Sequence, residues 1–184
     1  TIVYLNEPSP FQTSYELSNY NGYNISCFGY FDGWIEQITV GSVPPYTYNW
    51  SDGSTSENLT SVNSGTHFLT INDSNSCEST IQFDLNQPTN LQTDIVSLNN
   101  YNGYDISCNG YNDGSAQLIV SGSVSPYNII WSTGENTTTI SSLSSTPYYV
   151  EVTDENGCQI EDSVILTEPN LLTSNLESLN DYNS

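Results

Sequence analysis

Oxygen-bearing side chains in two pairs of loop segments are the residues of this sequence that could do chemistry. The first set consists of Asp32, Asp73 and Asn75. The equivalent second set consists of Asp113, Asp154, Glu155 and Asn156. Carboxylate and amide oxygens are the ligands that Ca²⁺ prefers, about six to eight at a time. Calcium is therefore the one cofactor that the sequence suggests. Asp-Gly and Asn-Gly pairs are also typical of plain turns, and this second interpretation is the one that the sequence favours.

The net charge makes a cation a reasonable counter-ion and excludes other partners. The 184 residues contain no Lys or Arg, 21 Asp and Glu and one His, so the formal net charge is −21 at pH 7. Nucleic acid is excluded, because phosphate binding depends on Lys and Arg. An anionic membrane surface is disfavoured as a partner for the same reason. The sequence contains no run of 18 apolar residues, so we expect no membrane insertion of this segment. We also expect no signal peptide at Thr1, so the segment would be mature or internal to a longer protein.

Nucleophilic catalysis has little support in the sequence. A serine nucleophile needs an adjacent base that is held by a third group, and the single histidine, His67, is expected on the inward face of a strand as a packing residue. Carboxylate pairs cleave glycosides in many enzymes, but such a pair is expected in a cleft, which small repeated sandwiches rarely form. We therefore predict that the protein is not an enzyme.

Four cysteines with equal spacing predict disulfides and an oxidising compartment. They are Cys27, Cys77, Cys108 and Cys158. Of the three possible connectivities, pairing within each repeat is the simplest, and we expect Cys27 to bond Cys77 and Cys108 to bond Cys158. Each bond would close a 50-residue interval, for which the loss of chain entropy in the unfolded state gives about 4 kcal/mol. The second bond would also bring Asp113 close to Asp154.

An internal repeat organises the chain. A shift of 81 residues aligns residues 19–88 with residues 100–169 without a gap, and repeats of this kind are built from similar structural units. We expect the end of a preceding repeat at 1–8, one β-sandwich repeat at 9–88, a second at 89–169 and the start of a following repeat at 170–184. Neighbouring repeats of the same chain are thus the first expected partners.

Short β-type runs separated by Gly, Pro, Asn, Asp and Ser predict an all-β fold of tandem immunoglobulin-like β-sandwich modules. In the second copy we expect strands at 92–98, 104–108, 115–121, 127–131, 137–141, 148–153 and 160–166. Alternation predicts the inward side chains: Ala116, Leu118, Val120, Tyr127, Ile129, Trp131, Tyr148, Val150, Val152, Val164 and Leu166. Trp50 is expected in the core of the first copy, and the facing of its strand at 34–40 stays open.

Aromatic residues cluster around the first cysteine of each repeat. They are Tyr20, Tyr23, Tyr30, Phe31 and Trp34, and Tyr101, Tyr104 and Tyr111. They could form an exposed platform for sugars, which would make extracellular glycans a partner. The favoured alternative is packing at the end of a sandwich, where Tyr buries its ring and keeps its hydroxyl in water.

The motifs of the second copy resemble the SprB-type repeat of gliding and cell-surface adhesins of Bacteroidota. The resemblance is carried by Cys108-Asn109-Gly110, Asn112-Asp113-Gly114-Ser115, Pro126-Tyr127, Trp131-Ser132-Thr133-Gly134, the run from Val152 to Cys158, and Glu168-Pro169. The first copy departs from it at Phe28, Trp34 and Ser76. The resemblance implies an extracellular, cell-surface location, export by the type IX route, and membership of long filaments used for adhesion or gliding.

The expected function is therefore a structural stalk segment of an extracellular adhesin filament. The alternatives are a glycan-binding repeat module and a surface-fibre subunit that polymerises laterally with other filament chains. The run Asp162-Ser163-Val164 resembles an O-glycosylation acceptor of Bacteroidota, which would make Ser163 a modification site.

Overall fold

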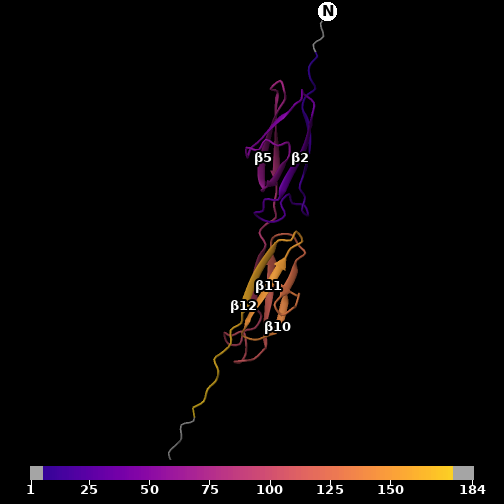
Figure 1. The fold of residues 1–184 in the computed structure, drawn as a ribbon. Helices are drawn as coiled ribbons and strands as arrows, with labels where there is room; N and C mark the ends of the chain where they lie inside the picture. Colours follow the sequence, from indigo (N-terminus) through magenta and orange to yellow (C-terminus); the bar gives the residue numbers. More distant parts are fainter. Residues whose placement is uncertain (1–5, 176–184) are drawn as a thin grey trace, which may run out of the picture. The chain divides into compact units, whose positions relative to one another are not determined.

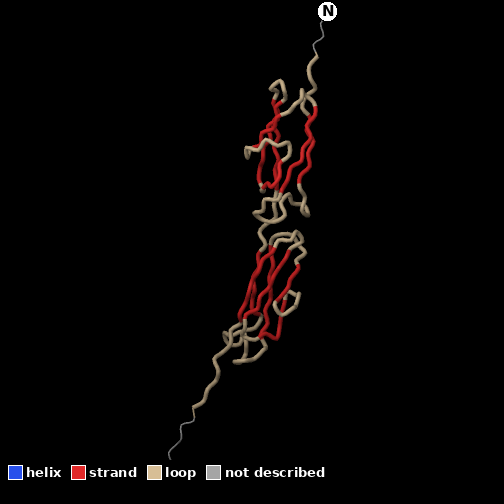
Figure 2. Tube along the Cα trace, in the orientation of Figure 1, coloured by secondary structure: helices blue, strands red, loops and turns tan. Residues whose placement is uncertain are grey.

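The computed structural model describes residues 6–175, and every regular element in that range is a β-strand (Figures 1 and 2). The strands are β1 (Gln12–Leu17), β2 (Gly33–Val40), β3 (Thr47–Trp50), β4 (Leu59–Val62), β5 (Gly65–Asn72), β6 (Glu78–Leu85), β7 (Gln92–Ser97), β8 (Gly114–Ser121), β9 (Asn128–Trp131), β10 (Thr139–Leu143), β11 (Pro147–Thr153) and β12 (Gln159–Ile165). The all-β prediction is confirmed. Within 6–175 no helix is long and apolar enough to cross a membrane.

The chain divides into two compact units, each built mainly from one sequence repeat. Unit 1 comprises Thr1–Gln92 with two added loops, Gly122–Tyr127 and Thr153–Gln159, and unit 2 comprises Thr93–Ser121, Asn128–Val152 and Ile160–Ser184. Two loops from the second half of the sequence therefore belong to unit 1. The repeat boundaries given above, at 9–88 and 89–169, stay a prediction.

Each unit contains two three-stranded sheets with the same strand order. In unit 1 the sheets are β1-β2-β4 and β3-β5-β6, and in unit 2 they are β7-β8-β10 and β9-β11-β12. All the strand pairs with a known register are antiparallel. Lettered in chain order, with strand D missing, these are the ABE and CFG sheets of an immunoglobulin sandwich. The predicted immunoglobulin-like class is confirmed.

The core of unit 1 lies between its two sheets. Ile35 on β2 and Leu69 on β5 are fully buried, and the ring centroids of Trp50 and Phe83 are 5.5 Å apart. The strand whose facing was left open points Gln37 and Thr39 inward, with exposures of 3% and 8%. The Gln37 side-chain amide donates to the Glu57 carbonyl oxygen at 3.2 Å and accepts from the Thr39 hydroxyl at 2.7 Å. These hydrogen bonds allow two polar residues to occupy core positions.

The expected inward faces of unit 2 are largely confirmed. The buried side chains include Ala116, Leu118, Ile129, Trp131, Val150, Val152 and Leu166, whereas Val120, Tyr127, Tyr148 and Val164 are partly buried. Trp50 and Trp131 are each 2% exposed, as predicted. His67 also faces inward, at 9% exposure, with its Nε2 3.0 Å from the Asn63 carbonyl oxygen. Sequence alternation thus identified most of the core.

The strand predicted at 104–108 was wrong. Tyr101 and Tyr104 form only an isolated bridge, around a turn in which Asn102 and Gly103 have φ values of 54° and 96°. Both the Asp105 and Ile106 N–H groups then donate to one acceptor, the carbonyl oxygen of Thr167, so no strand ladder continues. The fully buried Ile106 mimics the alternation of a strand in the sequence.

Candidate functional site: a buried disulfide and its loops

The disulfide of this protein joins the two sequence repeats. It connects Cys27 in repeat 1 (residues 19–88) to Cys158 in repeat 2 (residues 100–169), with a Cα–Cα distance of 5.7 Å and a sequence separation of 131. Both cysteines lie within unit 1 and are buried, at 4% and 6% exposure. Cys77 and Cys108 are free and exposed. The predicted pairing of Cys27 with Cys77 and Cys108 with Cys158 was therefore wrong.

The length of one strand explains why the two cysteines of a repeat do not meet. Asn24 and Ile25 both donate their N–H groups to the Asn86 carbonyl oxygen, so the segment leading to Cys27 is anchored just beyond the end of β6. Cys77 immediately precedes the start of β6 (Glu78–Leu85). Eight strand residues span about 25 Å, whereas a disulfide needs Cα atoms within about 7 Å.

Repeat 2 follows the same rule. The Asp105 and Ile106 N–H groups donate to the Thr167 carbonyl oxygen at 3.0 and 3.1 Å, just beyond the end of β12 (Gln159–Ile165). Cys158 immediately precedes that strand. The cysteines of one repeat therefore lie at opposite ends of its last strand in both copies.

One loop presents Cys158 and is organised by a single carboxylate. We call residues 73–77 and 154–158 the second-cysteine loops. Asp154, 6% exposed, accepts hydrogen bonds at Oδ1 from the N–H groups of Asn156 and Cys158, at 2.9 and 2.7 Å. Its Oδ2 accepts from the Val124 N–H at 3.1 Å and from the Ser123 hydroxyl. All these groups belong to unit 1, and together they fix the direction of the Cys158 side chain.

A second segment presents Cys27. We call residues 20–32 and 101–113 the first-cysteine loops. Asp32 accepts from the Ser26 N–H at 3.1 Å and from the Ser26 hydroxyl, and the Tyr20 hydroxyl donates to the Asp32 carbonyl oxygen at 2.9 Å. Burial, followed by the nearby Asp32 carboxylate, raises the pKa of Tyr20. Tyr20 therefore packs within its loop, as the favoured interpretation predicts. That interpretation does not hold for most of the other aromatic residues of the set, because Tyr30, Phe31, Tyr101, Tyr104 and Tyr111 are exposed.

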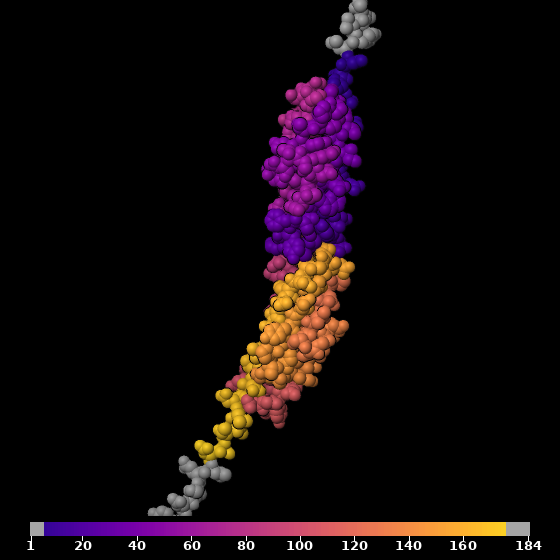
Figure 3. Space-filling model, viewed as in Figure 1, coloured from indigo at the N-terminus to yellow at the C-terminus, as the bar shows by residue number. Residues whose placement is uncertain are grey.

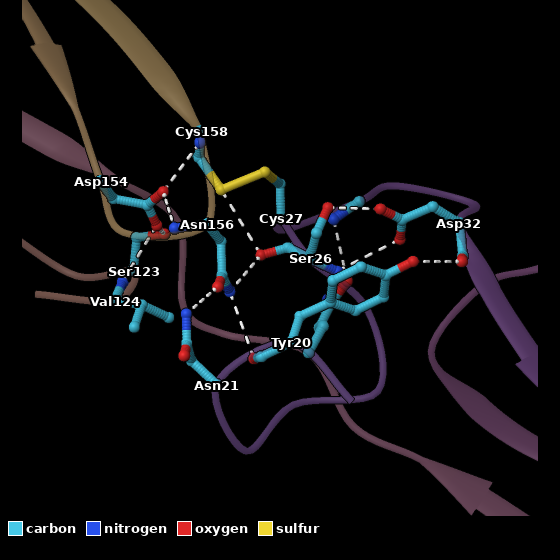
Figure 4. Close-up of a disulfide and its surroundings, with 12 residues drawn as sticks. Tyr20, Asn21, Ser26, Cys27, Asp32, Ser123, Val124, Asp154, Asn156 and Cys158 are labelled. Atoms are coloured by element: carbon cyan, nitrogen blue, oxygen red, sulfur yellow. Dashed lines mark hydrogen bonds between the residues drawn. A yellow bond between two sulfur atoms is a disulfide. The ribbon is translucent and has the colours of Figure 1, made fainter. Parts of the chain in front are cut away.

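Asn156 links the two loops beside the disulfide (Figure 4). Its Nδ2 donates to the Ser26 carbonyl oxygen at 3.0 Å and to the Tyr20 carbonyl oxygen at 3.3 Å. Its Oδ1 accepts from the Asn21 side-chain amide at 2.6 Å. One amide side chain thus makes three hydrogen bonds to the first-cysteine loop, and sequence reasoning had considered this residue only as a metal ligand.

The aspartates proposed as calcium ligands each accept hydrogen bonds within their own turn in this structure. The Ser42 hydroxyl, followed by the loop N–H groups of Cys77, Asn75 and Val43, lowers the pKa of Asp73, and the Ser107 hydroxyl lowers that of Asp113. Asn75 and Glu155 are exposed. Across residues 6–175, no three His, Cys, Asp or Glu side chains lie in an arrangement that could hold a metal ion. Calcium binding stays a prediction, which melting the protein with and without a chelator tests.

Two further surface features bear on binding. Three glutamates, Glu16, Glu36 and Glu57, line an open groove of about 540 Å³ on unit 1. The face of unit 1 that is seen in Figure 3 shows no deep hollow. Ser163, the proposed glycosylation site, is exposed on β12, and its N–H donates to the Asp162 carboxylate at 2.8 Å. Its modification stays a prediction.

Comparison with known proteins identifies the repeat. The family model of the SprB repeat matches residues 14–55 and 101–136. No curated protein matches the chain. Among solved structures, the C-terminal 282-residue fragment of intimin, in complex with the intimin-binding domain of the translocated intimin receptor, aligns with 12% identity and a TM-score of 0.40. That alignment covers 88% of this chain and 64% of the fragment, so it spans less than two thirds of the solved chain. The SprB repeat model thus matches one stretch in each of the two copies, and the resemblance seen in the cysteine, glycine and tryptophan motifs is confirmed.

Proposed function

We propose that this chain is a structural stalk segment of an extracellular adhesin filament on a bacterial surface. In this role the repeats hold a distal binding surface away from the cell and carry the load between that surface and the cell. Export by the type IX route and a part in gliding belong to the proposal through the SprB repeat. The absence of Lys and Arg suits an exposed stalk, because trypsin-like proteases find no site to cut.

The observation that carries the proposal is the disulfide between repeats. A tensile force on the chain ends would pass through the Cys27–Cys158 bond and bypass the chain between the two cysteines, which are 131 residues apart. Strands within that interval could then lose their hydrogen bonds without lengthening the chain. A bond within one repeat would protect only 50 residues. A bond that shields the chain of both repeats from extension serves a stalk under load, whereas glycan binding gains nothing from it.

Replacement of the repeats in the full-length protein tests the stalk role. Residues 9–169 are exchanged for two unrelated disulfide-stapled sandwich domains of similar length, and adhesion of the cells under shear is measured. A stalk predicts that adhesion is retained, because only spacing and strength matter. Deletion of the same residues is the matched control and should weaken adhesion. Loss of adhesion in the exchanged protein, with surface display intact, would contradict the proposal.

The second candidate function is glycan binding. It is favoured by the exposed rings of Phe28, Tyr30 and Phe31, at 52%, 54% and 65% exposure, in the first-cysteine loop of repeat 1. Tyr111 in repeat 2 is also exposed, at 57%. A glycan array separates the two functions. Saturable binding that disappears in a Phe31→Ser variant would support the glycan module, whereas the stalk predicts no saturable binding.

A further inference from the structure

Each repeat contains both a first-cysteine loop and a second-cysteine loop, but only one of each is bonded. Cys27 of repeat 1 is joined to Cys158 of repeat 2, which leaves Cys77 of repeat 1 and Cys108 of repeat 2 as free, exposed thiols. The bonded pair shows which loops fit together: the first-cysteine loop of one repeat and the second-cysteine loop of the next. Whether the free loops are built in the same way can be read from their hydrogen bonds.

The two second-cysteine loops have the same backbone. Asp154 Oδ1 accepts from the N–H groups two and four residues later at 2.9 and 2.7 Å, and Asp73 Oδ1 does so at 2.9 and 2.8 Å. Gly157 has a φ of 85°, and Ser76 holds the same left-handed region at 65° in spite of its side chain. The loop around the free Cys77 is therefore already in the bonding conformation.

The two first-cysteine loops also agree. The Ser26 N–H donates to Asp32 and the Ser107 N–H donates to Asp113, in both cases at 3.1 Å. In both loops the first cysteine's carbonyl oxygen accepts from the N–H three residues later, again at 3.1 Å. A tyrosine bridge closes the preceding turn in each copy. The loop around the free Cys108 thus repeats the loop that holds Cys27.

Burial is what distinguishes the free loops from the bonded ones. Cys27 and Cys158 are 4% and 6% exposed, whereas Cys77 and Cys108 are exposed. The same holds for their neighbours: Tyr20 is partly buried but Tyr101 is exposed, and Asn156 is partly buried but Asn75 is exposed. The free loops therefore present the bonding surfaces uncovered.

We infer that disulfides link every repeat to the next along an array. Cys108 would bond the second cysteine of a following SprB repeat, and Cys77 the first cysteine of a preceding one. The partner of Cys108 is a loop with the pattern Asp-x-Asn-x-Cys. Its Asn side chain would donate to the carbonyl oxygens of Tyr101 and Ser107, as Asn156 does to those of Tyr20 and Ser26. This inference goes beyond the stalk proposal and stands without it.

Formation of each bond needs a disulfide oxidant, such as oxidised glutathione. The thiolate of one cysteine attacks the oxidant and forms a mixed disulfide with release of one thiol. The partner thiolate then attacks the cysteine sulfur and releases the second thiol. Two cysteine thiols and one oxidant disulfide thus give one protein disulfide and two reduced thiols. The chain intervals that successive disulfides close would overlap, because Cys108 lies between Cys27 and Cys158 in the sequence.

Lengthening this chain by one repeat tests the inference. A duplicate of residues 89–169 is inserted after Pro169, with Tyr111→Phe and Ile160→Val in the duplicate so that its cysteine peptides differ in mass from those of the original repeat. The protein is then oxidised in a glutathione redox buffer. The digest uses proteases that cut after acidic or aromatic residues, because the repeats contain no Lys or Arg. Mass spectrometry should find Cys27 joined to Cys158, Cys108 joined to the duplicate of Cys158, and two of six thiols free. Cys108 left free, or bonded to any other cysteine, would overturn the inference.

A reciprocal pair of variants shows whether the loops direct this pairing. In the lengthened chain, Asn102→Ala should shift the glutathione equilibrium of the new bond by about fivefold, the effect of one hydrogen bond, and leave the Cys27–Cys158 bond unchanged. Asn21→Ala should do the reverse. Equal effects on both bonds would contradict recognition by the loops. Mapping of the native full-length protein gives an independent reading, in which disulfide peptides confined to one repeat would also refute the inference.

Discussion

Reduction of the Cys27–Cys158 disulfide should lengthen the fully unfolded chain by about 430–470 Å when the chain is pulled from its two ends. The bond holds the two Cα atoms 5.7 Å apart and bypasses a stretch of chain that spans a sequence separation of 131. Each fully extended residue contributes about 3.3–3.6 Å. The added length therefore follows from the connectivity alone and does not depend on the stability of either unit.

The connectivity expected from sequence would give a different result. Disulfides between Cys27 and Cys77 and between Cys108 and Cys158 would each bypass 50 residues. Reduction would then release two steps of about 165–180 Å each. The two connectivities thus differ both in the number of steps and in the size of each step.

Single-molecule force spectroscopy can measure this length directly. The chain is held by tags at its two ends and is stretched before and after addition of reductant. Cys158→Ser should show the full extension without reductant, whereas Cys77→Ser and Cys108→Ser, the matched controls, should behave like the original chain. An oxidised chain that already extends to about 610–660 Å, the length of 184 residues, would refute the Cys27–Cys158 bond in solution. Two shorter steps on reduction would refute it as well.

Three predictions concern stability. Gln37→Leu should lower the free energy of unfolding, measured with urea, by about 1–3 kcal/mol, because the partners of the amide lose a hydrogen bond in the core. Adding Thr39→Val should recover much of that loss. A double variant that is less stable still would contradict the role of this pair. Gly114→Ala should cost about 1–3 kcal/mol in the same assay, since its Cβ would lie 2.5 Å from a methyl carbon of Leu166; an unchanged urea midpoint would show that the core can yield there. Hydrogen bonds from Ser107 lower the folded-state pKa of Asp113, so the Asp113 carboxylate stabilises the fold above its unfolded pKa of about 3.9, and this stabilisation is lost as pH falls through the folded-state pKa. The difference in melting temperature between the original chain and Asp113→Asn should therefore narrow below about pH 4. A difference independent of pH would contradict this role of Asp113.

Much of the fold was predictable because its signals are local. The 81-residue repeat, the short β-type runs and the inward positions of Trp50, Trp131 and Val150 all follow from spacing along the chain. Gln37 was not assignable, because a polar residue in a core position depends on an acceptor from another segment, here the carbonyl oxygen of Glu57. The predicted strand at 104–108 failed for a related reason: Ile106 is buried by contacts made after a turn and not as part of a sheet.

The sequence by itself determined that four cysteines recur in two equal pairs, that their loops carry Asp, Asn and Gly, and that the motifs of the chain resemble the SprB repeat. Only the tertiary structure decided which sulfurs meet. The physical reason is that β6 and β12 each run the length of a sandwich between the two cysteine loops of their repeat, so the cysteines 50 residues apart lie at opposite ends. Spacing along a chain does not give distance in space, and here cysteines 131 residues apart form the bond.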